Sequence, residues 1–273
     1  TLVKKEYMVL MACRDLEKAE NAKQQLLKQV GSAKLDILPL DLASLDSVRA
    51  FAENFLKNYN RLDLLINNAG VMIPPYKKTI DGYELQFQAN YLGHFLLTGL
   101  LLPLLIHTQN SRVVALSSKA HENAEIDFED LQSEENYSRW KAYGQSKLAC
   151  LMFAKELNRR LQNIEASTIA LAAHPGISNT ALFRYFPKWF NKIISPILSP
   201  IMSHAPEEAA KTILNAALGN DVTGGSYYGP TGFMGFKGPP GEVAPSKNAN
   251  DKEVASRLWE VSEELVKFRY LGK

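Results

Sequence analysis

The sequence has little cysteine, no marked excess of charge of either sign and no hydrophobic run long enough to cross a bilayer. Its two cysteines, Cys13 and Cys150, form no CxxC or CxxxxH pattern, which argues against a disulfide framework and a zinc site. The 31 basic and 29 acidic residues give a net charge of +2, and without a long basic run this argues against a nucleic-acid partner. The longest apolar run, residues 95–106, is shorter than the roughly 18 to 20 residues that span a bilayer. We therefore expect a buried helix there and no transmembrane segment.

The start of the chain has no secretory signal pattern. Residues 1–6 lack a basic start followed by an apolar centre. With so few cysteines, we expect the cytoplasm or another reducing compartment, while a targeting segment upstream of Thr1 stays open. The 273 residues, 46% apolar and 22% charged, are typical of a soluble globular protein and allow one or two domains. We expect a single catalytic domain over residues 1–273.

Apolar runs of strand length alternate with helical patterns through most of the chain. Runs rich in Val, Ile and Leu are typical of strands that are buried on both faces. The alternation predicts a doubly wound parallel sheet between two layers of helices, an α/β/α fold. The expected strands are residues 8–13, 35–40, 62–66, 112–116 and 166–172, and the expected helices are residues 16–30, 45–58, 82–106 and 140–161.

The pattern changes after residue 174. Four prolines among aromatic and aliphatic residues predict short, broken helices that could form a substrate lid at about residues 176–205. Packing against the body of the protein or a second subunit is the alternative. Beyond this segment we expect a helix at 207–218, a strand at 226–228, a Gly/Pro-rich stretch at 229–241 and a C-terminal helical extension at about 251–268. The residues expected to contact substrate from the lid are Phe183, Phe186, Trp189 and Phe190.

Tyr143 and Lys147 lie four residues apart and are therefore neighbours on one face of an expected helix. About one such pair is expected by chance, and a second occurs at Tyr137 and Lys141, in an acidic, loop-like stretch. A lysine charge close to a phenol stabilises the phenolate, which helps a phenol to act as a general acid or base near neutral pH. An exposed pair without a role is the alternative.

The tetrapeptide Asn-Asn-Ala-Gly at residues 67–70 directly follows an expected strand. Chance predicts only about 0.01 copies of it in a sequence of this composition. Ligands bind beyond the carboxyl ends of the strands in open parallel sheets, so this position is a candidate for chemistry. A purely structural turn is the alternative, because Asn and Gly favour positive φ.

These features together resemble the short-chain dehydrogenases/reductases, from about Met8 to Thr180. Other details resemble the branch that holds retinol dehydrogenase-like and protochlorophyllide reductase-like enzymes. The resemblance implies a Rossmann-like fold that binds a dinucleotide. The matching motifs, in order, are Asn67-Asn68-Ala69-Gly70, Asn90-Tyr-Leu-Gly-His94, Ser118 in Val-Val-Ala-Leu-Ser-Ser, Tyr143-Gly-Gln-Ser-Lys147, and Pro175-Gly176 followed by Thr180.

The resemblance also implies a role for each of four polar side chains. Tyr143 would be the general acid/base, and Lys147 would promote its ionisation and hold the nicotinamide ribose. Ser118 would orient the substrate oxygen, and Asn90 would hold a water that links Lys147 to solvent. For Ser118 alone, a hydroxyl that caps the backbone at a strand end is the alternative.

Arg14 bears on the choice of cofactor. It follows Cys13 at a strand end where an acidic residue would favour NAD(H), and a cation there favours the 2'-phosphate of NADP(H). Pairing of Arg14 with Asp15 or Glu17 is the alternative.

The resemblance implies further cofactor contacts at Asp41 and Leu42 near the adenine, at Asn67, Ala69 and Gly70, and at Pro175, Gly176, Ile177 and Thr180 near the nicotinamide. His94 and His174 have no second ligand at metal spacing, so we expect no metal site.

One departure from the family concerns the pyrophosphate. The family's first strand and its Thr-Gly-x-x-x-Gly-x-Gly loop do not occur in this sequence. Because removal of that strand would uncover the middle of a sheet, we expect roughly 20 to 30 further residues upstream of Thr1.

The sequence thus predicts an NADP(H)-dependent oxidoreductase that interconverts a carbonyl and an alcohol on an apolar small molecule. Two rival functions stay open. One is a protein of the same fold that binds a dinucleotide or a partner without turnover, and the other is a light-driven reductase of a tetrapyrrole C=C bond. Apolar helix faces could serve a core or a homodimer equally well.

Overall fold

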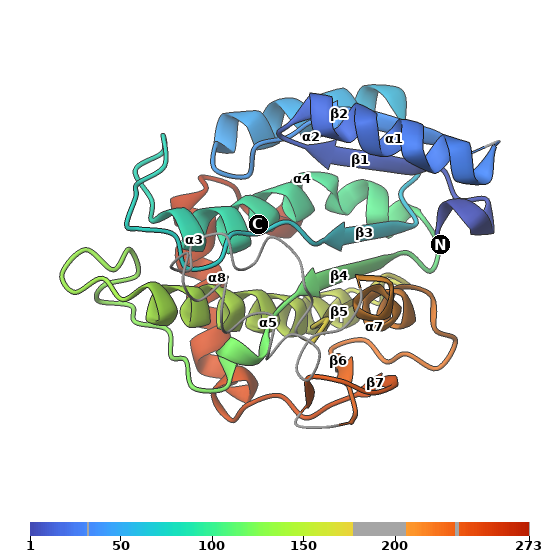
Figure 1. The fold of residues 1–273 in the computed structure, drawn as a ribbon. Helices are drawn as coiled ribbons and strands as arrows, with labels where there is room; N and C mark the ends of the chain where they lie inside the picture. The colour runs from blue at the N-terminus through green and yellow to red at the C-terminus, as the bar shows by residue number, and fades with distance from the viewer. Residues whose placement is uncertain (32, 177–205, 233–234, 273) are drawn as a thin grey trace, which may run out of the picture.

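Parallel strands form the centre of the molecule (Figure 1). Within residues 1–31, 33–176, 206–232 and 235–272, which the computed structural model describes, seven strands make two sheets. The smaller sheet pairs β1 (Val9–Cys13) with β2 (Leu35–Pro39) in parallel. The larger has the order β3-β4-β5-β6-β7, and its strands are β3 (Leu64–Asn67), β4 (Arg112–Leu116), β5 (Ile169–Ala173), β6 (Tyr227–Pro230) and β7 (Pro240–Glu242). β1 and β3 are end strands of different sheets and do not pair with each other.

Helices connect successive strands, as a doubly wound fold requires. The α-helices are α1 (Leu16–Val30), α2 (Leu45–Asn58), α3 (Leu85–Phe87), α4 (Gly93–His107), α5 (Arg139–Asn163), α7 (Pro206–Leu218) and α8 (Lys252–Leu265). The short helices are the π-helix η2 (Gln88–Leu92) and the 3-10 turns η1 (Val3–Lys5), η3 (Lys119–His121), η7 (Asn248–Asn250) and η8 (Tyr270–Gly272).

Side-chain caps fix where the first helices begin. The Asp15 carboxylate accepts a hydrogen bond from the Lys18 backbone N–H at 3.1 Å, and the Ser44 hydroxyl accepts one from Ser47 N–H at 3.2 Å. Each cap satisfies a donor that has no partner inside the helix and contributes on the order of 1 kcal/mol. α1 and α2 therefore have the bounds that the sequence predicts.

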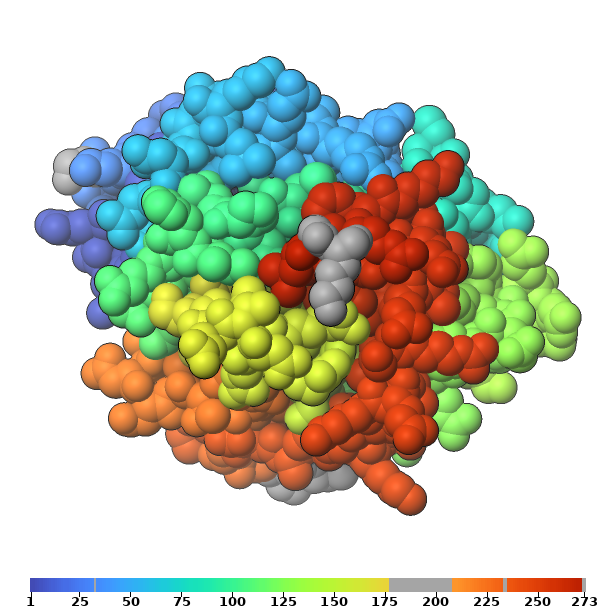
Figure 2. Space-filling view, turned by 180° about the vertical axis from the view of Figure 1, so that it is seen from behind, coloured from blue at the N-terminus to red at the C-terminus, as the bar shows by residue number. Residues whose placement is uncertain are grey.

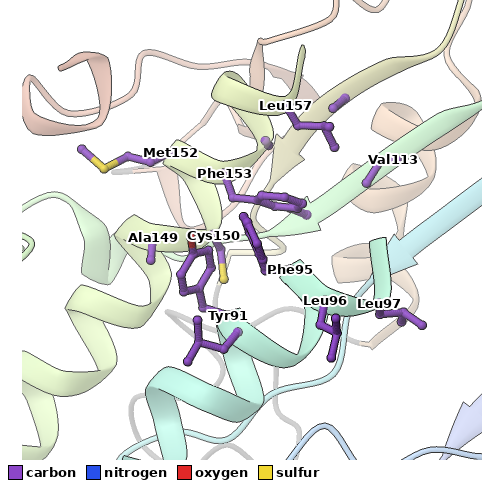
Figure 3. Close-up of a cluster of buried hydrophobic side chains, with 14 of the residues drawn as sticks. Tyr91, Phe95, Leu96, Leu97, Val113, Ala149, Cys150, Met152, Phe153 and Leu157 are labelled. Carbon is purple, nitrogen blue, oxygen red and sulfur yellow. The ribbon is translucent and has the colours of Figure 1, made fainter. Parts of the chain in front are cut away.

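The residues of β4 alternate between two cores. Val113 and Ala115 pack into a large cluster with side chains of α2, α4, α5 and α8, whereas Val114 and Leu116 pack into a smaller cluster with α7. The sheet thus lies between two layers of helices, which confirms the predicted α/β/α architecture. Figure 3 shows the large cluster, where the rings of α4 and its preceding turn meet those of α5. In Figure 2, the C-terminal segment, in red, lies against this layer.

Two expectations are wrong in detail. The stretch 229–241 holds the end of β6 and the first two residues of β7, which pairs antiparallel to β6, so the sheet is not wholly parallel. The helix expected at 82–106 is divided into α3, η2 and α4.

Residues Leu85–His107 have the length and hydropathy to cross a membrane, but 78% of their most apolar window is buried inside the protein, as expected of a core helix.

Candidate active site

A large cavity opens at the carboxyl ends of the parallel strands. Its volume is about 2170 Å³, which exceeds the usual range for a single drug-sized ligand. Segments that follow β1, β2, β3, β4 and β5 all contribute to its wall. The predicted site residues that line it are Arg14, Asp41, Gly70, Ser118, Tyr143, Lys147, Pro175 and Gly176.

Tyr143 and Lys147 face the cavity from α5, and both are largely buried. The Lys147 Nζ lies 5.9 Å from the centre of the Tyr143 ring and donates a hydrogen bond to the Leu116 carbonyl at 3.0 Å. The Ser117 hydroxyl donates to the Lys147 carbonyl at 2.7 Å, which further joins α5 to the end of β4. The lysine is therefore held by the strand end beside the phenol.

Tyr137, of the second Tyr-Lys pair, is part of a different arrangement. Its hydroxyl accepts a hydrogen bond from Gln86 Nε2 at 3.0 Å and lies 3.1 Å from the Pro74 carbonyl and 3.2 Å from the Glu84 carboxylate. Burial and the nearby Glu84 charge raise the pKa of Tyr137 well above its usual value. This phenol is used to join segments of the protein, whereas no hydrogen bond to the Tyr143 hydroxyl is found among the described residues.

Ser118 stands at the end of β4 and is the N-cap of η3. Its Oγ accepts a hydrogen bond from the Ala120 backbone N–H at 3.3 Å. The capping interaction is thus present, and it leaves the hydroxyl hydrogen able to point elsewhere. The side chain can cap the turn and donate a hydrogen bond into the cavity at the same time.

The segment after β3 approaches Lys147 closely. At Gly70, a Cβ would lie 2.9 Å from Asn90 Oδ1 and 3.5 Å from Lys147 Nζ, so a side chain there would crowd both groups. Asn67 is buried: its Nδ2 donates to the Thr98 hydroxyl at 2.9 Å, and its Oδ1 has no partner among the described residues. Asn68 lines the cavity, whereas Asn67 and Ala69 do not.

Asn90 joins three parts of the protein behind the cavity. Its side chain bonds both backbone groups of Val71, at 2.7 and 3.0 Å, and donates to the Ser146 hydroxyl at 2.9 Å. Its backbone carbonyl accepts from His94 Nδ1 at 2.8 Å and Cys150 Sγ at 3.1 Å. Asn90 lies in the π-helical turn η2. His94 and Cys150 therefore serve as hydrogen-bond partners of the backbone of this turn.

Burial keeps two histidines of this region neutral. Desolvation lowers the pKa of His94 to about 4, and desolvation also lowers that of His174, which precedes Pro175, to about 4. His174 Nδ1 accepts a hydrogen bond from the Gly176 N–H at 3.3 Å. Both rings therefore act as uncharged structural groups at neutral pH.

Arg14 lines the opposite part of the cavity. Of the two alternative partners, Asp15 forms an ion pair with Lys18 at 2.5 Å, and Arg14 forms no ion pair with Asp15, Glu17 or any other described residue. Nearby, Asp41 accepts from the Ala43 N–H at 3.0 Å, and Leu42 is buried away from the cavity. The guanidinium is thus available to an anionic ligand.

Some predicted residues lie outside the part of the chain that the structure describes. They are Ile177, Thr180 and the four lid residues Phe183, Phe186, Trp189 and Phe190. Conversely, two residues that line the cavity were not predicted as site residues: Phe236, and Gly144, which the motif Tyr143-Gly-Gln-Ser-Lys147 contains without a role. Phe236 comes from a loop remote in sequence, and the contact that Gly144 makes with the Ala120 carbonyl has no local signature.

Comparisons with known proteins agree with the motifs and the fold. The sequence model of the short chain dehydrogenase family matches residues 1–190. Retinol dehydrogenase 14 of Mus musculus is 43% identical, with 94% of this chain and 78% of that protein covered. Retinol dehydrogenase 13 of Homo sapiens is 41% identical, with 94% and 76% covered. The crystal structure of an uncharacterized protein from Mycobacterium Paratuberculosis has a TM-score of 0.78 and 39% identity, and covers 96% of this chain and 85% of that one.

Proposed function

The chain belongs to the short-chain dehydrogenase family, and from this premise we propose that it is an NADP(H)-dependent oxidoreductase that interconverts a carbonyl and an alcohol on an apolar small molecule. One observation carries the proposal: Tyr143, Lys147 and Ser118 line the same cavity, with the lysine held beside the phenol. A phenol, a fixed cation and a hydroxyl around one space are the groups that proton transfer to a carbonyl oxygen requires.

The residues at two parts of the cavity fit a nicotinamide dinucleotide. Gly70 leaves the space next to Lys147 Nζ that a Cβ would fill, so a ribose can approach the ammonium group there. At the adenosine end, Arg14 offers a guanidinium without an ion pair among the described residues. The glycine-rich pyrophosphate loop of the family does not occur in this sequence, so none of its residues is assigned to the pyrophosphate.

The chain's own groups supply the proton transfer. A bound nicotinamide would donate or accept the hydride. In the direction of reduction, the Tyr143 hydroxyl gives its proton to the substrate oxygen, and in oxidation it takes the proton back. Lys147 places a positive charge beside the phenol that gives and takes this proton. Ser118 Oγ, which already accepts from Ala120 N–H, donates its own hydrogen to the same substrate oxygen.

The preference for NADP(H) rests on Arg14. A guanidinium forms charge-assisted, bidentate hydrogen bonds with a phosphate. The nearby Asp15 carboxylate forms its ion pair with Lys18, and its charge acts on Arg14 without an ion pair between the two. We therefore expect Arg14 to contact the 2'-phosphate.

The substrate class follows from the cavity wall and the relatives. Met72, Trp140 and Phe236 line the cavity together with the polar groups, as is usual for pockets that bind apolar ligands. Two relatives that the chain matches over 94% of its length are retinol dehydrogenases by name. We infer an apolar aldehyde or ketone and the corresponding alcohol.

The function is tested by incubating the purified protein in the dark with NADPH and a series of apolar aldehydes, and with NADP⁺ and the matching alcohols. We expect oxidation of NADPH that depends on the aldehyde, and formation of the alcohol in equal amount. Binding of NADPH without turnover of any compound in the series would favour the non-catalytic rival. Turnover of a tetrapyrrole that occurs only under illumination would favour the other rival.

A further inference from the structure

His121, which the proposed reaction does not use, is buried next to the proposed site. It is the last residue of η3, three positions after Ser118, and its side chain has no exposed surface. Its ring packs edge-on against Tyr227, with the ring centres 5.2 Å apart. The other charged or titratable groups that act on it are Lys119, Glu122 and His174.

Hydrogen bonds to two backbone groups determine which ring nitrogen of His121 carries the hydrogen. The Ser118 carbonyl lies 2.6 Å from Nδ1, and a carbonyl can only accept, so Nδ1 carries a hydrogen. The Ser246 backbone N–H donates to Nε2 at 3.2 Å, so Nε2 carries none. Burial lowers the pKa of His121, in agreement with a neutral ring. The ring thus joins the turn after β4 to the segment that precedes α8.

The turn that holds Ser118 depends on such contacts. A single 3-10 turn is not stable by itself, because its few backbone bonds do not offset the entropy of ordering it. The C-terminal segment makes a second contact three residues after η3, where Asn248 Nδ2 donates to the Ala124 carbonyl at 2.9 Å. In the part of the chain that the structure describes, Ser118 Oγ is itself held only by the longer bond from Ala120 N–H, at 3.3 Å. A shift of the turn would therefore redirect the Ser118 hydroxyl.

We propose that His121 is a positioning residue, whose neutral ring ties the Ser118 backbone to Ser246 and thereby fixes the direction of the Ser118 hydroxyl. This role rests on the proposed function, since Ser118 needs a fixed direction only if it orients a substrate oxygen. Deviations of about 1 Å at a reacting group can reduce rates by as much as 100-fold.

Three substitutions of His121 separate positioning from packing. His121→Asn keeps a donor close to the Nδ1 position, His121→Gln keeps an acceptor close to the Nε2 position, and His121→Phe keeps only the ring. We expect kcat/KM to fall at least about tenfold in His121→Phe, with the Kd for NADPH within twofold of the native value. His121→Asn should recover most of the activity because it can donate to the Ser118 carbonyl, and His121→Gln should not.

Asn248→Ala loosens the contact between the same two segments without removing a buried ring, so it remains informative if His121→Phe does not fold. We expect a several-fold loss of kcat/KM and unchanged NADPH affinity. The matched control is Asn58→Ala, because Asn58 Nδ2 donates to the Asn54 carbonyl within α2 and Asn58 is not among the residues that line the cavity. Its kcat/KM should equal that of the native protein.

Tyr143→Phe separates failure of this inference from failure of the proposed function. If Tyr143→Phe retains turnover, the proposed function fails, and the role of His121 fails with it. If Tyr143→Phe is inactive but His121→Phe and Asn248→Ala are as active as the native enzyme, only the role of His121 is overturned. Equal loss in all three His121 variants, in step with their thermal stability, would likewise overturn positioning and assign the ring to packing.

Discussion

Lys147 holds its ammonium group 5.9 Å from the centre of the Tyr143 ring, and the Leu116 carbonyl accepts its hydrogen bond at 3.0 Å. The lysine is thereby fixed between a strand end and the phenol, on a helix whose inward face is almost fully buried. A fixed cation stabilises a phenolate better than a mobile one, because no reorganisation is needed when the charge forms.

Replacing Tyr143 with Phe should therefore abolish most turnover and leave the fold intact. The change removes only the oxygen that transfers the proton, so we expect kcat to fall roughly 100-fold or more, with the Kd for NADPH little changed. Steady-state kinetics and a cofactor titration measure the two effects.

Tyr137→Phe is the control for this prediction. The Tyr137 hydroxyl bonds Gln86 and lies against Glu84 inside the protein, so its loss should lower the free energy of unfolding by about 1 to 3 kcal/mol. Turnover of the folded protein should persist. Loss of turnover in Tyr137→Phe but not in Tyr143→Phe would reverse the assignment of the two pairs.

Arg14→Ala should change cofactor preference. The guanidinium lines the cavity and forms no ion pair among the described residues, so it is available to the 2'-phosphate. We expect binding of NADPH to weaken by about 2 kcal/mol, roughly 30-fold, and binding of NADH to stay nearly constant. Isothermal titration with each cofactor measures this. Lys57→Ala, which removes an exposed cation paired with Glu53 on α2, should affect neither; equal losses of both cofactors in Arg14→Ala would make Arg14 structural.

Local signals in the sequence were sufficient for most of the fold. The bounds of α1 and α2 follow from their caps at Asp15 and Ser44, and β4 follows from an unbroken apolar run. The π-helical turn η2 could not be predicted, because it accompanies bonds from Asn90 to Val71 and Ser146, which lie 19 and 56 residues away. For β7 the Gly/Pro-rich sequence gives no strand signal, and pairing with β6 decides its conformation.

The site residues likewise divide into those with a local sequence signal and those whose role depends on distant contacts. The motifs locate Ser118, Tyr143 and Lys147 because each lies at a strand end or on a helix face with a regular period. The role of Tyr137 in joining segments depends on Glu84 and Gln86, more than 50 residues away, so the two Tyr-Lys pairs could be separated only by their surroundings. His121 gave no signal, since a histidine three residues after a serine has no pattern of its own.

The free energy of unfolding should fall on acidification from about pH 7 to pH 5. Burial lowers the pKa of His94 and of His174 to about 4, below the 6.5 of an exposed histidine. The unfolded chain therefore binds these protons first, and stability present above pH 6.5 is lost as the pH falls towards 4. Each ring should account for about 2 kcal/mol at pH 5. Burial also lowers the pKa of His121, which adds to this loss of stability. Burial raises the pKa of Glu84, so uptake of a proton by this carboxylate in the folded protein opposes the loss.

Urea unfolding at the two pH values measures this difference. His107→Gln is the control, because the His107 side chain is exposed in the folded protein and its replacement should leave the difference unchanged. Equal unfolding free energies at pH 7 and pH 5 would contradict the prediction.

Gly144→Ala should impair catalysis through the backbone. A Cβ at Gly144 would lie 2.9 Å from the Ala120 carbonyl oxygen and 3.2 Å from the Ala124 Cβ, so α5 and the turn after Ser118 would have to separate. The shift would increase the distance between Ser118 and Tyr143, and we expect kcat/KM to fall at least about tenfold with the Kd for NADPH unchanged. Kinetics well below the melting temperature measure the loss.

Gly99→Ala provides the matched control, because it is also a helical glycine whose Cβ would clash. That Cβ would lie 2.6 Å from the Phe268 ring and 2.7 Å from the Tyr270 ring, in the core and not at the cavity wall. Both variants should lose about 1 to 3 kcal/mol of stability from overpacking. Only Gly144→Ala should lose kcat/KM in its folded state, since only its clash lies between the two catalytic groups. If both variants retain native kcat/KM, the close contact of Gly144 with Ala120 is a matter of packing alone.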